Sequence, residues 1–130
     1  TQSRSSAASD VYKRQIYSSP AIHAARIVAH VLGDSDLHAQ WLQELAQMRL
    51  RMAAMRKALH EQLCALRPGH DFAYLLHQRG MFSYTGLTAQ QVDRLREQEA
   101  VYLIRSGRMC VAGLNSGNVA RVAGAMAAVI

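Results

Sequence analysis

The fold is decided by two stretches, GMFSYTGL at residues 80–87 and SGRMCVAGLN at residues 106–115. Each stretch is a short apolar run interrupted by glycine, which is typical of a strand next to a turn, and the residues between the two have the pattern of an amphipathic helix. Arg108 stands out because it follows a Ser-Gly pair and precedes small or apolar residues. A guanidinium held at the edge of a packed region needs an anion.

These stretches resemble the C-terminal part of the class I aminotransferases that use pyridoxal phosphate, in particular the aspartate and aromatic amino acid branch. The likeness runs from Tyr17 to Ile130, with two long motifs in the right order and at the right separation. It implies an α/β fold, the C-terminal small-domain part of a fold-type I pyridoxal-phosphate-dependent transferase. A long linking helix and an α/β sandwich are its expected parts, and strands mixed with helices and crossovers also indicate such a sandwich.

The resemblance implies two substrate-binding residues. In the family, the arginine of the Ser-Gly-Arg motif, here Arg108, binds the α-carboxylate of the substrate, and the aromatic residue of the Gly-Met-Phe-Ser motif, here Phe82, faces the side-chain pocket. From the residues alone, Arg108 also fits a solvated or salt-bridged arginine, and Phe82 also fits a core position. A further arginine of the family coincides by counting with Arg14. Because Arg14 lies in a segment that resembles the translation of a sequencing adapter, we assign no substrate-binding role to it.

An aminotransferase passes an amino group from an amino acid to a 2-oxo acid through pyridoxal phosphate, by a ping-pong mechanism. The resemblance therefore implies amino acid and 2-oxo acid substrates, aromatic or acidic, and a homodimer when complete. The family's catalytic lysine and phosphate-binding groups lie upstream of the matched region. Lys57 is the one lysine after residue 15 and nothing marks it as catalytic, so the chain alone is expected to be inactive.

Composition divides the chain into four expected segments. Residues 1–15 are serine-rich, and Asp10 to Gln15 resemble the translation of a sequencing adapter, so residues 1–15 are read as a non-native or disordered leader. Residues 16–34 are expected to end the large cofactor-binding domain, 35–67 to form a long interdomain helix, and 68–130 to form the small C-terminal domain.

The long helix is predicted from apolar residues spaced three and four apart. They are Leu37, Trp41, Leu45, Met48, Met52, Met55, Leu59, Leu63 and Leu66. Asp34 or Ser35 can cap this helix, and the Arg67-Pro68-Gly69 run is expected to end it. An earlier helix is expected from about Pro20 to Leu32, with Gly33 ending it.

In the small domain, strands are predicted at residues 72–76, 81–84, 101–104 and 109–112. Thr88 and Gln91 form a capping-box pattern for a helix that ends near Ala100. Asn115 or Ser116 is expected to cap a last helix whose apolar face carries Val119, Val122, Met126 and Val129.

Charge and composition bear on the remaining function classes. The formal charge of +6 falls to +4 without the leader and is scattered along helices, which argues against a nucleic-acid partner. No apolar run approaches the length of a membrane span.

The cysteines and histidines do not form a recognisable site. Cys64 and Cys110 are far apart, and His23 and His30 lack further ligands, so neither a disulfide framework nor a metal site is expected. Cys110 reads as a small buried residue, and a reducing cytoplasm fits best.

A different class of function is also compatible with the sequence. A free-standing helical protein-interaction module would use the methionine-rich stripe from Leu37 to Leu66 as its partner surface. Such a module is expected to be a stable folded domain, whereas a piece of an enzyme exposes apolar faces that the rest of the enzyme covers.

Overall fold

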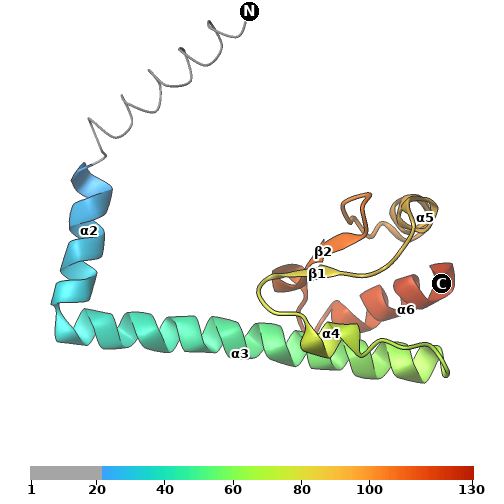
Figure 1. Ribbon diagram of the computed structural model, residues 1–130, viewed down its shortest axis with the longest axis horizontal. Coiled ribbons are helices and arrows are strands. Elements are labelled where there is room, and N and C mark those ends of the chain that lie inside the picture. The colour runs from blue at the N-terminus through green and yellow to red at the C-terminus, as the bar shows by residue number, and fades with distance from the viewer. Residues whose placement is uncertain (1–21) are drawn as a thin grey trace, which may run out of the picture. The chain divides into compact units, whose positions relative to one another are not determined.

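The computed structural model describes residues 22–130 (Figure 1). The chain divides between Glu44 and Leu45 into two compact units. The predictions made for the leader at residues 1–15, the coincidence at Arg14 and the predicted start of the first helix near Pro20 lie outside the described residues. Within residues 22–130, no helix combines the length and the apolar character that crossing a membrane requires.

The first unit contains α2 (Ile22–Gly33) and the start of α3 (Ser35–Leu66). Gly33 is the last residue of α2, as predicted. Asp34 caps α3, because its Oδ1 accepts hydrogen bonds of 3.0 Å from the backbone N–H groups of both Asp36 and Leu37. The bond from Leu37 is the main reason that the pKa of the Asp34 carboxyl lies below its ordinary value. Of the two candidate caps, Asp34 is therefore the one used.

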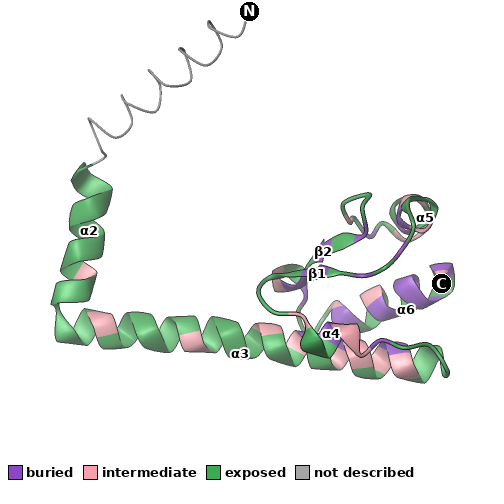
Figure 2. Cartoon of the chain, in the orientation of Figure 1, coloured by how far each residue is buried: buried purple, intermediate pink, exposed green. Residues whose placement is uncertain are grey.

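The helix α3 runs without a break for 32 residues and ends before Arg67-Pro68-Gly69, as predicted. Its buried residues, Arg56, Leu59 and Leu63, all lie in its C-terminal half (Figure 2). The N-terminal half of the predicted stripe is exposed instead, at Leu37, Trp41, Leu45 and Met48. Packing in the second unit therefore uses only the last part of the stripe.

The core of the second unit is formed by α3 together with α5 (Ala89–Glu99), α6 (Val119–Val129) and the segments between them. Its fully buried large side chains come from five different segments of the chain. They are Leu59, Leu63, Phe72, Leu75, Leu95, Val111 and Met126. The apolar face predicted for the last helix is confirmed, with Val119, Met126 and Val129 buried.

The sheet consists of two antiparallel strands, β1 (Phe82–Tyr84) and β2 (Arg108–Cys110). Phe82 lies opposite Cys110, and Tyr84 lies opposite Arg108. The strand predicted at residues 81–84 is confirmed. The strand predicted at 109–112 is shifted and shorter, because Val111–Gly113 forms the 3₁₀ turn η1.

Two other predicted strands are wrong. Residues 74–77 form the helix α4 (Tyr74–His77), because Asp71 Oδ1 accepts the backbone N–H of Ala73 at 2.8 Å and starts a helical turn. Residues 101–104 form no strand, and only Ile104 makes an isolated bridge, to Arg108. In residues 22–130 the expected α/β sandwich is thus mostly helical, with one small strand pair.

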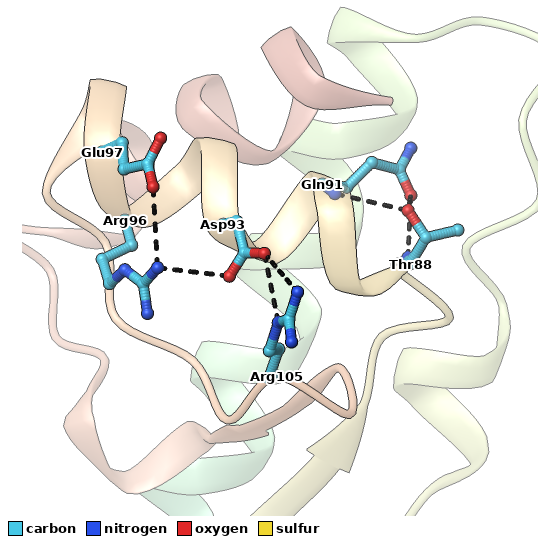
Figure 3. Close-up of polar contacts among 6 residues, drawn as sticks. All are labelled: Thr88, Gln91, Asp93, Arg96, Glu97 and Arg105. Carbon is cyan, nitrogen blue, oxygen red and sulfur yellow. Dashed lines mark hydrogen bonds and ion pairs between the residues drawn. The ribbon is translucent and has the colours of Figure 1, made fainter.

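Of the two helix N-caps predicted in the second unit, those of α5 and α6, one is confirmed. The capping box of α5 is confirmed: the Thr88 N–H donates to Gln91 Oε1 at 2.8 Å, and the Gln91 N–H donates to Thr88 Oγ1 at 3.3 Å (Figure 3). For α6 the N-cap is Asn118, without a capping bond from its side chain. The predicted cap Asn115 instead accepts the N–H of Gly117 within the preceding turn, at 2.9 Å.

Candidate carboxylate-binding site

The two strands present one face to the core and one to solvent. Ser83 and Met109 are buried, whereas Phe82, Tyr84, Arg108 and Cys110 are exposed. Because successive side chains of a strand point to opposite faces, the antiparallel register gathers the four exposed side chains on one surface. The two residues predicted as substrate-binding, Arg108 and Phe82, therefore lie together.

Arg108 and Phe82 are in direct contact. The guanidinium carbon of Arg108 lies 4.9 Å from the centre of the Phe82 ring, within the range of a cation–π interaction. Phe82 is 46% exposed, so the core alternative for this residue is wrong. Among residues 22–130, no carboxylate forms an ion pair with Arg108, which leaves its hydrogen-bond donors available to an anion.

The turn before Arg108 depends on Gly107. This residue has a φ of +83°, and a Cβ added to it would lie 2.9 Å from the carbonyl oxygen of Leu87. The Gly107 carbonyl accepts hydrogen bonds from the Thr85 N–H at 2.9 Å and from Thr85 Oγ1 at 2.8 Å. Only glycine fits this turn without strain, and the turn delivers Arg108 directly into β2.

A second attachment holds the same turn to α5. Arg105 donates from Nε and Nη2 to Oδ2 of Asp93, at 3.1 and 2.9 Å, and Asp93 also lies 3.3 Å from Arg96 (Figure 3). Arg96 contacts Glu97 in turn, at 3.6 Å. The side chains of Arg96, Glu97 and Arg105 are more than half exposed and that of Asp93 is 24% exposed, so each pair contributes at most about 1 kcal/mol. Their role is to restrict the position of the residues that precede Arg108.

Ile104 and Tyr84 flank Arg108. The Ile104 N–H donates to the Arg108 carbonyl at 3.1 Å, and Tyr84 is the partner of Arg108 across the strand pair. Both flanking side chains are at least half exposed. The guanidinium of Arg108 therefore lies between largely apolar side chains on a surface that is open to solvent.

Arg56 supports the strand from behind, and the sequence did not reveal it. The side chain is only 5% exposed, and it donates to the carbonyl of Phe82 at 2.7 Å, to that of Gly80 at 2.9 Å and to Ser83 Oγ at 3.1 Å. Burial lowers the pKa of Arg56, and the nearby charge of Arg79 lowers it further. Arg56 lies on the same face of α3 as the buried Leu59 and Leu63. A charged residue at such a position was the one sign in the sequence that it has a structural role.

Gln78 is a further support that the sequence did not reveal. Its Oε1 accepts hydrogen bonds from Ser83 Oγ at 2.5 Å and from the Tyr84 N–H at 2.8 Å, and its Nε2 donates to the Tyr84 carbonyl at 3.0 Å. The amide side chain thus takes the place of a neighbouring strand along the free edge of β1.

Other candidate residues have plainer roles. Cys110 is exposed on the Arg108 face, so the prediction that it is buried is wrong; the strand register places it outside, opposite Phe82. Lys57 is 72% exposed and lies 3.8 Å from Glu61. His23 and His30 are both exposed. In the part of the chain that the structure describes, no group of three or more potential metal ligands occurs.

Comparison with known proteins shows the family to which the chain belongs. The family model of the aminotransferases of class I and II matches residues 6–126. The chain is 60% identical over 117 residues to the aromatic-amino-acid aminotransferase of Escherichia coli, covering 90% of this chain and 30% of that protein. It is 45% identical over 117 residues to an aspartate aminotransferase of Pseudomonas aeruginosa, covering 90% of this chain and 29% of that protein.

A solved structure shows the same similarity. The crystal structure of the aromatic-amino-acid aminotransferase from Burkholderia pseudomallei, covalently bound to pyridoxal phosphate, matches with a TM-score of 0.85 and 52% identity, over 89% of this chain and 29% of that one. The chain thus spans about 30% of the length of the relatives it matches. The chain belongs to the aminotransferases of class I and II and corresponds to a fragment of such an enzyme.

Proposed function

We propose that this chain is the substrate-carboxylate-binding part of a pyridoxal-phosphate-dependent aminotransferase that acts on aromatic or acidic amino acids. The observation that carries the proposal is the exposed guanidinium of Arg108, which lies on Phe82 and has no ion-pair partner in residues 22–130. The names of the relatives support this substrate class, since they include both aromatic and aspartate enzymes.

The geometry suits a carboxylate. The planar guanidinium can donate two parallel hydrogen bonds to one carboxylate, and contact with the Phe82 ring limits the orientations of the fork. Phe82 also presents an apolar surface beside the bound carboxylate, where a substrate side chain can pack. In this proposal Arg108 orients the substrate, and Phe82 positions Arg108 and lines the side-chain pocket.

The cofactor is expected to be held by residues outside this chain. When bound, pyridoxal phosphate carries the amino group between the amino acid and the 2-oxo acid. Within residues 22–130 the only lysine is Lys57, whose exposed side chain pairs with Glu61. The described residues therefore supply binding and orientation of substrate, and we expect no transamination from the chain alone.

The proposed domain organisation follows the family. Residues 16–34 would end the large domain, residues 35–67 would link the domains, and residues 68–130 would form the small domain of a cytoplasmic homodimer. The exposed apolar side chains of α2 and early α3 support this, because in the complete enzyme further protein would cover them. They are Ile22, Ile27, Val28, Leu32, Trp41, Leu42 and Leu45.

A chimera tests the proposal. Residues 16–130 would replace the corresponding part of the E. coli aromatic-amino-acid aminotransferase, which is similar enough for the pieces to assemble. We expect transamination of tyrosine or aspartate with 2-oxoglutarate. Arg108→Lys keeps the charge but loses the fork, so kcat/KM should fall by about 100-fold or more.

A matched substitution separates binding from general effects of charge. Arg94→Lys, on the exposed surface of α5, should leave kcat/KM within about twofold of the unchanged chimera. If Arg108→Lys and Arg94→Lys had equal kinetics in an active chimera, Arg108 would not be the carboxylate-binding residue.

The exposed apolar surface of α2 and early α3 also favours a second candidate, a protein-interaction module. The two candidates differ in the behaviour of the 130-residue chain by itself. A module would be a stable, monomeric folded domain, whereas the enzyme fragment should self-associate through this surface.

A further inference from the structure

A second basic site lies away from Arg108. A cavity of about 570 Å³ is lined by one face of α3 and by residues 78–80. Three of its lining residues are arginines, Arg49 and Arg56 from α3 and Arg79 from the segment before β1, and none is acidic. Positions 49 and 56 are two helical turns apart, so both side chains belong to the same face of α3.

The charge in this cavity is uncompensated. Arg56 is nearly fully buried, and its four hydrogen bonds all go to neutral oxygens, of Leu75, Gly80, Phe82 and Ser83. Arg79 lies close enough for its charge to lower the pKa of Arg56. Within residues 22–130, none of the three arginines forms an ion pair with a carboxylate. Three cations around one cavity repel one another unless an anion joins them.

We propose that this cavity binds a carboxylate group. Arg49 and Arg79 are exposed and can turn their guanidinium forks to the anion, while buried Arg56 contributes a fixed positive charge at the base. Met52 and Ala53 add an apolar wall that suits the carbon chain of a small dicarboxylate. The carboxylate comes either from a free dicarboxylate or from an acidic side chain in the remaining part of the enzyme.

This site is separate from the Arg108 site. Arg56 approaches β1 on the face of Ser83, whereas Arg108 and Phe82 lie on the opposite face. A ligand in the cavity therefore needs neither Arg108 nor Phe82.

The first experiment titrates the 130-residue chain, diluted until it is monomeric, with succinate, using sodium chloride at matched ionic strength as the reference. The NMR signals of the arginine Nε–H groups report on each guanidinium. We expect the signals of Arg49 and Arg79 to shift with succinate and not with chloride. Arg79→Gln should abolish saturable binding, and Arg94→Gln, an equal loss of charge on α5, should preserve it. Equal responses to succinate and chloride would overturn the proposal.

The second experiment identifies the source of the carboxylate and does not depend on the solubility of the isolated chain. It measures thermal unfolding of the chimera carrying Arg108→Gln, so that succinate cannot act through the proposed substrate site. A free ligand raises the melting temperature in succinate by several degrees, and Arg79→Gln abolishes the rise.

An acidic side chain already in the cavity gives a different result. Succinate then has no effect on the chimera, and Arg79→Gln lowers its melting temperature by several degrees more than Arg94→Gln. If succinate has no effect and Arg79→Gln is no more harmful than Arg94→Gln, the cavity holds no carboxylate. If the chimera carrying Arg108→Gln loses its activity but still binds succinate, the cavity and the Arg108 site are two separate binding sites.

Discussion

Nη2 of Arg56, on α3, donates a hydrogen bond of 2.7 Å to the carbonyl oxygen of Phe82, on β1. The same guanidinium reaches Gly80 and Ser83, so one buried side chain fixes the backbone around the ring on which Arg108 lies. The position of the candidate site is thus tied to the long helix by side-chain hydrogen bonds as well as by apolar packing.

Arg56→Lys is expected to destabilise the second unit by about 3 kcal/mol, because one ammonium cannot replace four guanidinium hydrogen bonds and buried carbonyls lose their donors. Urea unfolding followed by circular dichroism measures the loss. Arg94→Lys on exposed α5 is the control, with an expected change within about 0.5 kcal/mol. Equal unfolding midpoints for the two variants would show that the hydrogen bonds of Arg56 contribute little.

Gly107→Ala is expected to destabilise the protein by at least about 2 kcal/mol, because the added Cβ meets the Leu87 carbonyl at 2.9 Å and the φ of +83° disfavours alanine. Gly124→Ala is the opposite case, since Gly124 lies inside α6 with open space around its Cβ position. That change should stabilise by about 0.5–1 kcal/mol. Thermal unfolding should therefore move the two variants in opposite directions, and a shared direction would contradict the geometry of the turn.

Ala100→Gly is expected to stabilise the end of α5. Ala100 ends this helix with a φ of +50°, a left-handed conformation that costs a residue with a Cβ about 1 kcal/mol. Glycine relieves that strain, although its more flexible unfolded state offsets part of the gain. Ala54→Gly, on the exposed surface of α3, lacks the strain and should destabilise by about 1 kcal/mol. Chemical unfolding of both variants tests the difference in sign.

Stability should fall as the pH rises above about 10, and Tyr74 is responsible for part of the fall. Burial raises the pKa of Tyr74, and the charge of Asp71 raises it further from an ordinary value of 10.0. The unfolded chain therefore loses the phenolic proton at a lower pH than the folded chain, so this contribution is complete below pH 10 and is lost as the pH rises through the folded pKa.

Tyr74→Phe should make stability less dependent on pH above 10, as measured by urea unfolding at several alkaline pH values. At neutral pH the same change should cost about 1 kcal/mol, because the hydroxyl donates to the Thr85 carbonyl at 3.0 Å. Tyr102→Phe, at a highly exposed position, should leave the pH dependence unchanged. An unaltered alkaline slope in the Tyr74 variant would exclude this residue as its source.

Local signals in the sequence were sufficient to predict α3 and the start of α5, but not the short helix α4. The apolar period and the Pro-Gly stop predict the extent of α3, and Thr88 with Gln91 predicts the start of α5. The apolar run at residues 72–76 was ambiguous, because such a run suits a strand or a buried helical turn equally well. The hydrogen bond from Ala73 to Asp71 selects the helix.

The candidate site was predictable where its residues adjoin recognisable motifs and not where it depends on distant contacts. Arg108 and Phe82 were identified from motifs that resemble the aminotransferase family. Their roles in binding substrate stay predictions, and the structure adds their direct contact. The exposure of Cys110 follows from pairing with Phe82, 28 positions earlier in the chain. The partners of Arg56 lie 19 to 27 residues away, so no local pattern could indicate them.

The alternation along β2 makes the length of the preceding turn as important as its composition. Arg108 faces solvent and Met109 faces the core only because the register with β1 is the observed one. One residue added between Ile104 and Arg108 would, if the pairing slipped to match, exchange these faces, burying the guanidinium and exposing the methionine. Insertions and deletions in this turn should therefore be far less tolerated than substitutions at its exposed positions.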